Sequence, residues 1–334
     1  PINQPNLLLN PTFSSVGTLA DAWRCIRWRK QALSRHPADC MLDHDELCDA
    51  ALDDRGFSPI MKRRYWAPFM RSVLLTAGQF TSSRLVDYTH SLLTRGTPAV
   101  PDAGMQAIPA QVAADLPKGT IELNTRVTKI RGRTIHLNNG TTQRSCAIVV
   151  ATGPEAALQL LEQTPKPSEG QVSTTLYFDT PIAPDIGRRL VLNGTGTGAV
   201  NHVLAPSRFS NDVAPDGRHL VAATLIDCDP NASDASLFTA AREELKDWFG
   251  YEVMAWNPIG VNRTQQPVRT TYSTFDIKKA KIRPGLWVCD TTIAGQTLDG
   301  IFDNARGIAA TIIETEQRRR HQSLVIQSVP TVFN

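Results

Sequence analysis

The sequence predicts a mixed α/β fold, because helical and strand-like patterns occupy different parts of the chain. Residues 18–95 carry apolar side chains at helical spacing, whereas residues 120–151 alternate apolar and polar side chains and then become continuously apolar. Near the C-terminus, the stretch from Gly285 to Arg320 reads as a short apolar strand, a polar loop and a helix. Such a helix start presents unpaired N–H groups that favour phosphate or other electron-rich oxygens.

Composition limits the classes of protein that the chain can belong to. Its 334 residues suffice for about two domains, and its 41% hydrophobic and 20% charged residues are ordinary for a globular protein. A net charge of +3 is too small to indicate a nucleic-acid partner. The six cysteines are scattered without a CxxC pair, which argues against a metal site and a disulfide framework, so we expect a reducing, cytoplasmic compartment. No apolar stretch approaches the roughly 20 residues of an integral membrane segment.

The first predicted helix is basic and aromatic. It places Leu19, Trp23, Ile26 and Leu33 at helix-compatible spacing, and arginines and a lysine fill the positions between them. Two interpretations stay open: a contact with a membrane surface or nucleic acid, and a solvated helix with one buried face. The shortness of the basic run favours the second.

Further helical patterns follow as far as Gly96. Residues 43–76 are predicted helical with a break around Gly56 and Pro59. Another helix follows, for which Thr81, Ser82 or Ser83 could be the N-cap. The first hundred residues are therefore expected to be mainly helical.

Strand patterns dominate the middle of the chain. A turn at Asn138–Gly140 joins two alternating segments, and the apolar run 147–151 predicts a buried strand that ends at Thr152–Gly153 before a helix. Strand-like runs at 171–180, 188–193 and 217–227 precede an amphipathic helix that ends at Gly250. The string Gly194, Gly196, Gly198 opens no helix, so we interpret it as a hairpin loop.

Several separated motifs resemble one known superfamily. The segments "AGMQAIPAQVAADLP", "IELNTRVTKI" and "IHLNNGTTQRSCAIVVATG" resemble the central part of the FAD-dependent amine oxidase superfamily, and "GFSP" and "TSSR" resemble its helical part. That superfamily includes monoamine oxidase, protoporphyrinogen oxidase and the phytoene desaturases. The motifs occur in the family's order, from about Thr18 to Ile313.

The resemblance implies an incomplete FAD-binding Rossmann-like domain that is interleaved with a substrate domain of mixed β-sheet and helices. Residues 1–99 would be the helical part of the substrate domain, and 156–280 its sheet and helix. Residues 100–155 and 281–316 would be the middle and C-terminal segments of the FAD-binding domain, followed by a tail, 317–334.

The resemblance also implies where FAD would bind. Val127 would touch the adenine through its backbone, and Thr152 and Gly153 would lie beside the dinucleotide. Asp290 or Thr291 would approach the pyrophosphate and ribityl chain. The flavin ring would face the start of a helix, at Leu298, Asp299, Gly300 and Ile301. The positive end of the helix dipole there would stabilise the negative charge of a reduced flavin. No catalytic residue is implied, because flavin itself accepts the hydride in this superfamily.

Two departures from the family pattern keep alternatives open. Asp290–Thr291 stands where the family has Gly-Asp, and a shift of one residue in a strand turns a side chain to the opposite face. The family's GxGxxG segment, which binds the pyrophosphate, is not found in residues 1–60. We expect a chain truncated at its N-terminus; a degenerate flavoprotein and a split enzyme are the alternatives.

The function implied is FAD-dependent oxidation or desaturation of a small or lipophilic substrate by hydride transfer to flavin N5. The alternative is a non-catalytic remnant or split-partner protein that keeps the fold without flavin. Peripheral contact with a membrane stays open, and the sequence does not indicate the oligomeric state.

Overall fold

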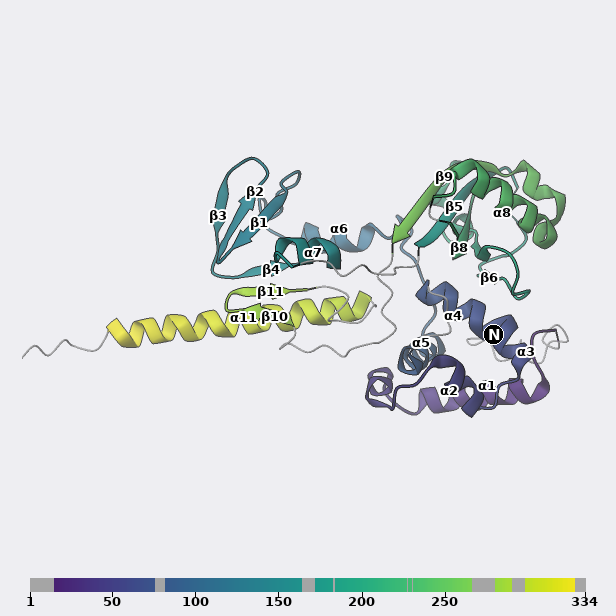
Figure 1. Cartoon of the computed structure of the whole chain (residues 1–334), viewed down its shortest axis with the longest axis horizontal. Coiled ribbons are helices and arrows are strands. Elements are labelled where there is room, and N and C mark those ends of the chain that lie inside the picture. The colour runs from purple at the N-terminus through teal and green to yellow at the C-terminus, as the bar shows by residue number, and fades with distance from the viewer. Residues whose placement is uncertain are drawn as a thin grey trace, which may run out of the picture. The chain divides into compact units, whose positions relative to one another are not determined.

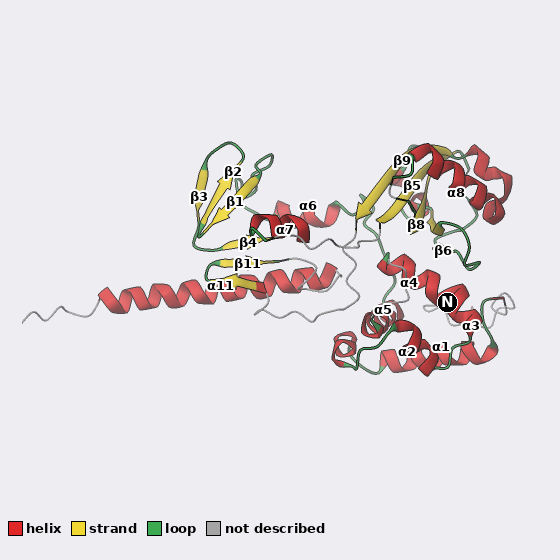
Figure 2. Cartoon of the chain, viewed as in Figure 1, coloured by secondary structure: helices red, strands yellow, loops and turns green. Residues whose placement is uncertain are grey.

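The computed structural model describes residues 15–75, 82–163, 172–182, 184–226, 228–229, 231–265, 280–289 and 298–327 (Figure 1). The chain divides into two compact units that alternate along the sequence. Unit 1 comprises residues 1–117 and 169–271, and unit 2 comprises residues 118–168 and 272–334. Helices and strands both contribute, as the sequence predicts (Figure 2).

The N-terminal part of unit 1 is helical. Its elements are α1 (Leu19–Leu33), η3 (Pro37–Leu42), α2 (Cys48–Asp54), α3 (Pro59–Met61), the π-turn η4 (Lys62–Trp66), α4 (Ala67–Leu74), α5 (Ser83–Arg95) and α6 (Ala107–Ala114). The predicted break at Gly56 and Pro59 is confirmed, because α2 ends before it and Pro59 opens α3.

Helix α1 has one buried face, but that face does not carry Leu19, Trp23, Ile26 and Leu33. The buried residues are instead Asp21, Ala22, Trp28 and Ala32. Asp21 is fully buried and accepts hydrogen bonds from the backbone N–H and hydroxyl groups of both Thr18 and Ser58. Burial alone would raise the pKa of Asp21, but these bonds from Ser58 and Thr18 hold it below its usual value.

An aromatic cluster forms the core of these helices. Trp28 and Trp66 lie 4.9 Å apart between ring centroids, and Phe57 packs edge-on against Trp66 at 5.5 Å. The ring of His90 stacks on Trp28 at 4.2 Å, and burial lowers the pKa of His90 to about 3. His90 is therefore neutral at physiological pH, so that it packs as an apolar ring.

A five-stranded antiparallel sheet forms the second part of unit 1. Its order is β6 (Val191–Leu192), β7 (Val200–Leu204), β8 (His219–Ile226), β5 (Val172–Thr180) and β9 (Asn257–Gln265). Helix α8 (Asp234–Phe249) packs on one face through Leu237, Phe238, Ala241 and Leu245. The glycine string at 194–198 joins β6 to β7, which confirms the predicted hairpin loop.

Unit 2 contains two three-stranded sheets. The strands β1 (Val127–Arg131), β2 (Thr134–Leu137) and β3 (Thr142–Arg144) form a meander with a turn at Gly140 (φ +82°), and β10 (Lys281–Arg283), β11 (Leu286–Val288) and β4 (Ile148–Val150) form the second sheet. The described helices of this unit are α7 (Pro154–Leu160) and α11 (Leu298–Gln327). One core joins these elements through Ile130, Val150, Ala157, Leu286 and Ile308.

All six cysteines are free thiols. Burial raises the pKa of Cys25 and of Cys48 to about 12, so both stay protonated and unreactive at neutral pH. Cys146, two residues before β4, is the exposed one.

We expect Asp21→Asn to destabilise unit 1 by about 2–4 kcal/mol at pH 7, because the buried donors around residue 21 would lose a charged acceptor. The folded pKa of Asp21 is lowered, so its stabilisation is present above the unfolded value of about 3.9 and is lost as the pH falls through the folded value. The deficit of the variant should therefore shrink below about pH 4.

Urea unfolding followed by tryptophan fluorescence measures this difference, since Trp287 is the one tryptophan of unit 2. Asp54→Asn, at the exposed end of α2, is the matched control and should change stability by less than about 0.5 kcal/mol. A deficit of D21N that stays constant from pH 7 to pH 3 would contradict the assignment.

Candidate cofactor site

The centre of unit 2 is a parallel pair of strands. β4 and β11 run side by side, with Ile148 opposite Leu286 and Val150 opposite Val288. The backbone N–H of Cys289 donates to the carbonyl of Val150 at 2.8 Å, so the pairing continues to the end of both strands. The carboxyl ends of parallel strands lie at one edge, which is where open α/β sheets bind ligands.

The residues that follow β4 at this edge are accessible. Ala151, Thr152 and Gly153 are all exposed, and α7 begins at Pro154. A side chain added at Gly153 would meet nothing within 4 Å, and its φ of −57° is one that any residue adopts. This edge therefore has room beside Thr152 and Gly153.

The residues that follow β11 lead into α11. Asp290 and Thr291 lie outside the described residues, so their positions stay predictions. Helix α11 is described from Leu298 onward, so the predicted Leu298, Asp299, Gly300 and Ile301 form its first described turn. Leu298 is 49% exposed and Asp299 is exposed, whereas Gly300 and Ile301 are half-buried.

Asn304 is the functional candidate that the sequence analysis missed. It is fully buried, and neither its side-chain oxygen nor its nitrogen has a hydrogen-bond partner in the described part of the chain. The buried Nε1 of Trp287, in β11, also lacks one there. Buried polar groups are normally paired, so Asn304 and Trp287 are candidates for a contact with a partner from outside the described residues, although buried atoms without a described partner also occur in unit 1, at Trp66, His90 and Thr94. The sequence did contain one indication that Asn304 faces the core: it lies four and eight residues before Ile308 and Ile312, which share its face of the helix.

Val127 packs against the hydrophobic core of unit 2. It is the first residue of β1, pairs with Leu137 and packs half-buried against the cluster that contains Val150 and Ile308. An ion pair of 2.5 Å joins Lys129 of β1 to Glu162 after α7. Val127, Thr152, Gly153 and the start of α11 therefore all belong to unit 2.

A second candidate surface lies in unit 1, on the sheet face that α8 does not cover. Thr175 of β5 pairs with Thr224 of β8, their hydroxyl oxygens 3.1 Å apart, and Tyr177 pairs with Ala222. His202 of β7 lies opposite Thr224 on the same face, and burial lowers its pKa to about 4. This face therefore presents hydroxyl groups and an imidazole that is neutral at pH 7 among apolar side chains.

Comparison with protein families decides where the chain belongs. The family described as flavin containing amine oxidoreductase matches residues 41–313, which is most of the chain. The chain belongs to this family. It is accordingly an oxidoreductase of the flavin-containing amine oxidoreductase type, which confirms the resemblance on which the sequence analysis rested.

Solved structures agree on the fold of this flavin-containing amine oxidoreductase. An oxidoreductase from Methanosarcina mazei superposes with a TM-score of 0.63 at 14% identity, over 82% of this chain and 70% of that one. A protein from an Exiguobacterium species, provisionally named a protoporphyrinogen oxidase, gives 0.61 at 15% identity, over 83% and 71%. The cyclohexylamine oxidase of Brevibacterium oxydans gives 0.56 at 14% identity, over 94% and 77%. No curated protein is similar enough in sequence to match.

No helix within the described residues is both long and apolar enough to cross a membrane.

We expect Asn304→Leu to leave the melting temperature of the flavin-free protein unchanged or to raise it by up to about 4 °C, because the substitution removes polar atoms that have no described partner. Asn193→Leu is the matched control. Asn193 is buried and donates to the carbonyls of Thr197 and Val200 and to Glu244, so its loss should cost about 2–4 kcal/mol.

Differential scanning calorimetry measures both variants beside the natural protein. A loss for N304L as large as that for N193L would show that the protein itself already satisfies the Asn304 amide. An unchanged N304L protein would leave the amide available to an outside partner.

Proposed function

We propose that the chain is an FAD-dependent oxidoreductase that oxidises or desaturates a small or lipophilic substrate. The observation that carries the proposal is the parallel pair of β4 and β11, which ends beside the exposed Thr152 and Gly153 and is followed by α11. Family membership supports a flavin, and FAD is the form that we propose.

Unit 2 would hold the cofactor. The backbone of Val127 would contact the adenine, Thr152 and Gly153 would lie along the dinucleotide, and Asp290 or Thr291 would approach the pyrophosphate and ribityl chain. The flavin ring would lie near Leu298, Asp299, Gly300 and Ile301, at the positive end of the α11 dipole. The open space at Gly153 and the Asn304 amide, which has no partner among the described residues, support this placement of the cofactor.

When bound, FAD supplies a hydride acceptor at flavin N5, and the protein supplies position and electrostatics. In this proposal unit 1 binds the substrate, with its helical region 56–95 and its sheet 171–228 as the lining elements. The sheet face opposite α8 supports this role, because Thr175, Tyr177 and His202 are half-buried there and combine apolar contact with a few hydrogen-bonding groups. His202 would act as a neutral hydrogen-bonding group, since its pKa of about 4 keeps it uncharged at pH 7.

We also propose that the protein works in a reducing, cytoplasmic compartment, because its six cysteines are all free thiols.

The second candidate function is a non-catalytic remnant or split-partner protein that keeps the fold without flavin. Asp290–Thr291 in place of the family's Gly-Asp is the observation that favours it.

An absorbance spectrum of the purified natural protein tests the proposal. The reading frame upstream of the Pro1 codon is sequenced first, so that the longest natural chain is used. We expect bands near the characteristic flavin wavelengths, retained after gel filtration and restored by added FAD after stripping. A protein that stays colourless with excess FAD would support the remnant or split-partner alternative.

A charge placed at the strand edge gives a sharper test. We expect Gly153→Glu to weaken FAD binding at least about ten-fold, because a carboxylate there would repel the pyrophosphate, an effect of at least about 1.4 kcal/mol. The substitution should be tolerated in the fold, since nothing lies within 4 Å of the new Cβ.

The matched control is Thr142→Glu, which adds the same charge at an exposed position of β3 in the same unit. Quenching of flavin fluorescence during titration measures both affinities. Equal affinities for G153E, T142E and the natural protein would remove Thr152 and Gly153 from the site, even if the protein binds FAD elsewhere.

A further inference from the structure

The outward face of α1 carries an apolar stripe that Lys30 alone interrupts. Leu19, Trp23, Ile26 and Leu33 are 83%, 61%, 45% and 47% exposed. Residues three and four positions apart share a helix face, so the four side chains run along the whole helix. The opposite face, with Asp21 and Trp28, is the buried one. Soluble monomers rarely leave such a stripe uncovered, which indicates an interaction surface.

Positive charge borders this stripe on both sides. At 100° per residue, Lys30 falls on the stripe itself, and Arg27 and Arg29 fall on either side of it. The guanidinium carbon of Arg27 lies 5.4 Å from the centre of the Trp23 ring. Asp21 is the sole acidic residue of α1, and it is fully buried, so no carboxylate of this helix faces outward.

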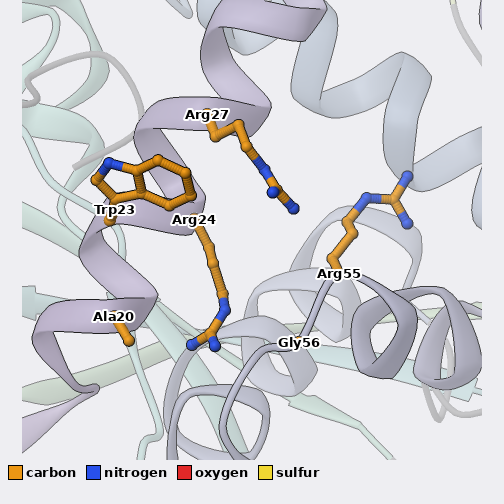
Figure 3. Close-up of a pocket in the computed structure, with 6 residues that line it drawn as sticks. All are labelled: Ala20, Trp23, Arg24, Arg27, Arg55 and Gly56. Atoms are coloured by element: carbon orange, nitrogen blue, oxygen red, sulfur yellow. The ribbon is translucent and has the colours of Figure 1, made fainter.

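A cavity of about 450 Å³ opens beside Trp23. Figure 3 shows Trp23, Arg24 and Arg27 of α1 on one side of it and Arg55 and Gly56 on the other. The absence of a side chain at Gly56 matters, because its φ is +79° and a Cβ there would lie 3.0 Å from Nε of Arg24. The cavity is therefore bounded by three guanidinium groups and one indole ring.

Two of these arginines are held in place by carboxylates, one fully buried and one half-buried. Arg24 pairs with Asp21 at 3.3 Å, and Arg55 pairs with Asp87 at 2.7 Å while lying over the ring of Trp28. Arg27 has no carboxylate within ion-pair distance in the described part of the chain. Guanidinium groups suit phosphate oxygens because their planar N–H forks match them. The arrangement is pre-organised for an anionic phosphate group.

We propose that α1 and this arginine cavity form a docking surface for membranes that contain anionic phospholipids. The stripe enters the boundary between headgroups and acyl chains, with Trp23 at the interface, and the cavity receives a lipid phosphate. The combination of stripe and cavity favours a lipid surface over nucleic acid, which would leave Leu19, Ile26 and Leu33 in water. This inference does not depend on the flavin site, because it concerns unit 1 alone.

Vesicle co-sedimentation tests the proposal on the whole chain. We expect binding to vesicles of phosphatidylcholine and phosphatidylglycerol at 70:30 to be at least about ten-fold tighter than to phosphatidylcholine alone, and to weaken in 0.5 M salt. Trp23→Gln should weaken binding at least about five-fold through lost apolar insertion, and Arg27→Gln about five-fold through lost charge. Both residues are exposed, so the melting temperatures should stay unchanged.

Tyr251→Gln is the matched control. Tyr251 is also an exposed aromatic residue of unit 1 with a cation over its ring, Lys246 at 5.8 Å, but it lies outside α1. Its variant should bind vesicles like the natural protein. Equal binding of W23Q, Y251Q and the natural protein would overturn the proposal, as would no binding to either vesicle.

Two further outcomes would also overturn it. If 10 mM inorganic phosphate raises the melting temperature of the natural protein but not of R27Q, and no vesicle is bound, the cavity is a site for a small anion. If single-stranded DNA binds with the same dependence on Trp23 and Arg27 while vesicles do not, the surface recognises nucleic acid.

Discussion

The parallel pairing of β4 with β11 is the constraint on which unit 2 depends. Parallel strands cannot be joined by a tight turn, so a long connection must run between them. Residues 151–285 provide it, and they include the whole five-stranded sheet of unit 1. In this topology the middle and the C-terminal segment bury their apolar side chains against each other. Val150, Leu286 and Ile308 then share one core, and the strand ends that follow them share one edge.

Two fully buried polar residues, one in each unit, differ in their hydrogen bonding. In unit 1, Asp21 is surrounded by donors and lies inside a helical core, where it fixes the loop before α3 to the start of α1. In unit 2, Asn304 is buried as deeply without a described partner. The first arrangement is complete by itself and contributes stability. The second has no hydrogen-bond partner among the described residues, and a partner from outside them would offset the cost of burying the amide.

Much of this fold could be predicted from local signals. Glycine at 140 and 250 and proline at 59 and 154 mark where elements start or end, because each residue restricts or widens the allowed backbone angles. Local signals do not predict which face of α1 is buried. Its apolar spacing points to Leu19 and Trp23, whereas hydrogen bonds from Thr18 and Ser58 draw Asp21 inside. The spacing of Asn304 from Ile308 and Ile312 places it on the core face of α11, but only tertiary packing shows that its amide is buried without a described partner.

The distribution of the cysteines has a practical consequence. Five of the thiols are buried or half-buried, and only Cys146 is exposed. It lies just before β4, and its carbonyl oxygen lies 3.3 Å from where a Cβ on Gly285, just before β11, would be. A maleimide dye added to the unmodified protein should therefore attach first at the entrance to the parallel strand pair. A fluorophore at that position would report on the pairing of two distant chain segments during refolding, without the need to remove any native cysteine.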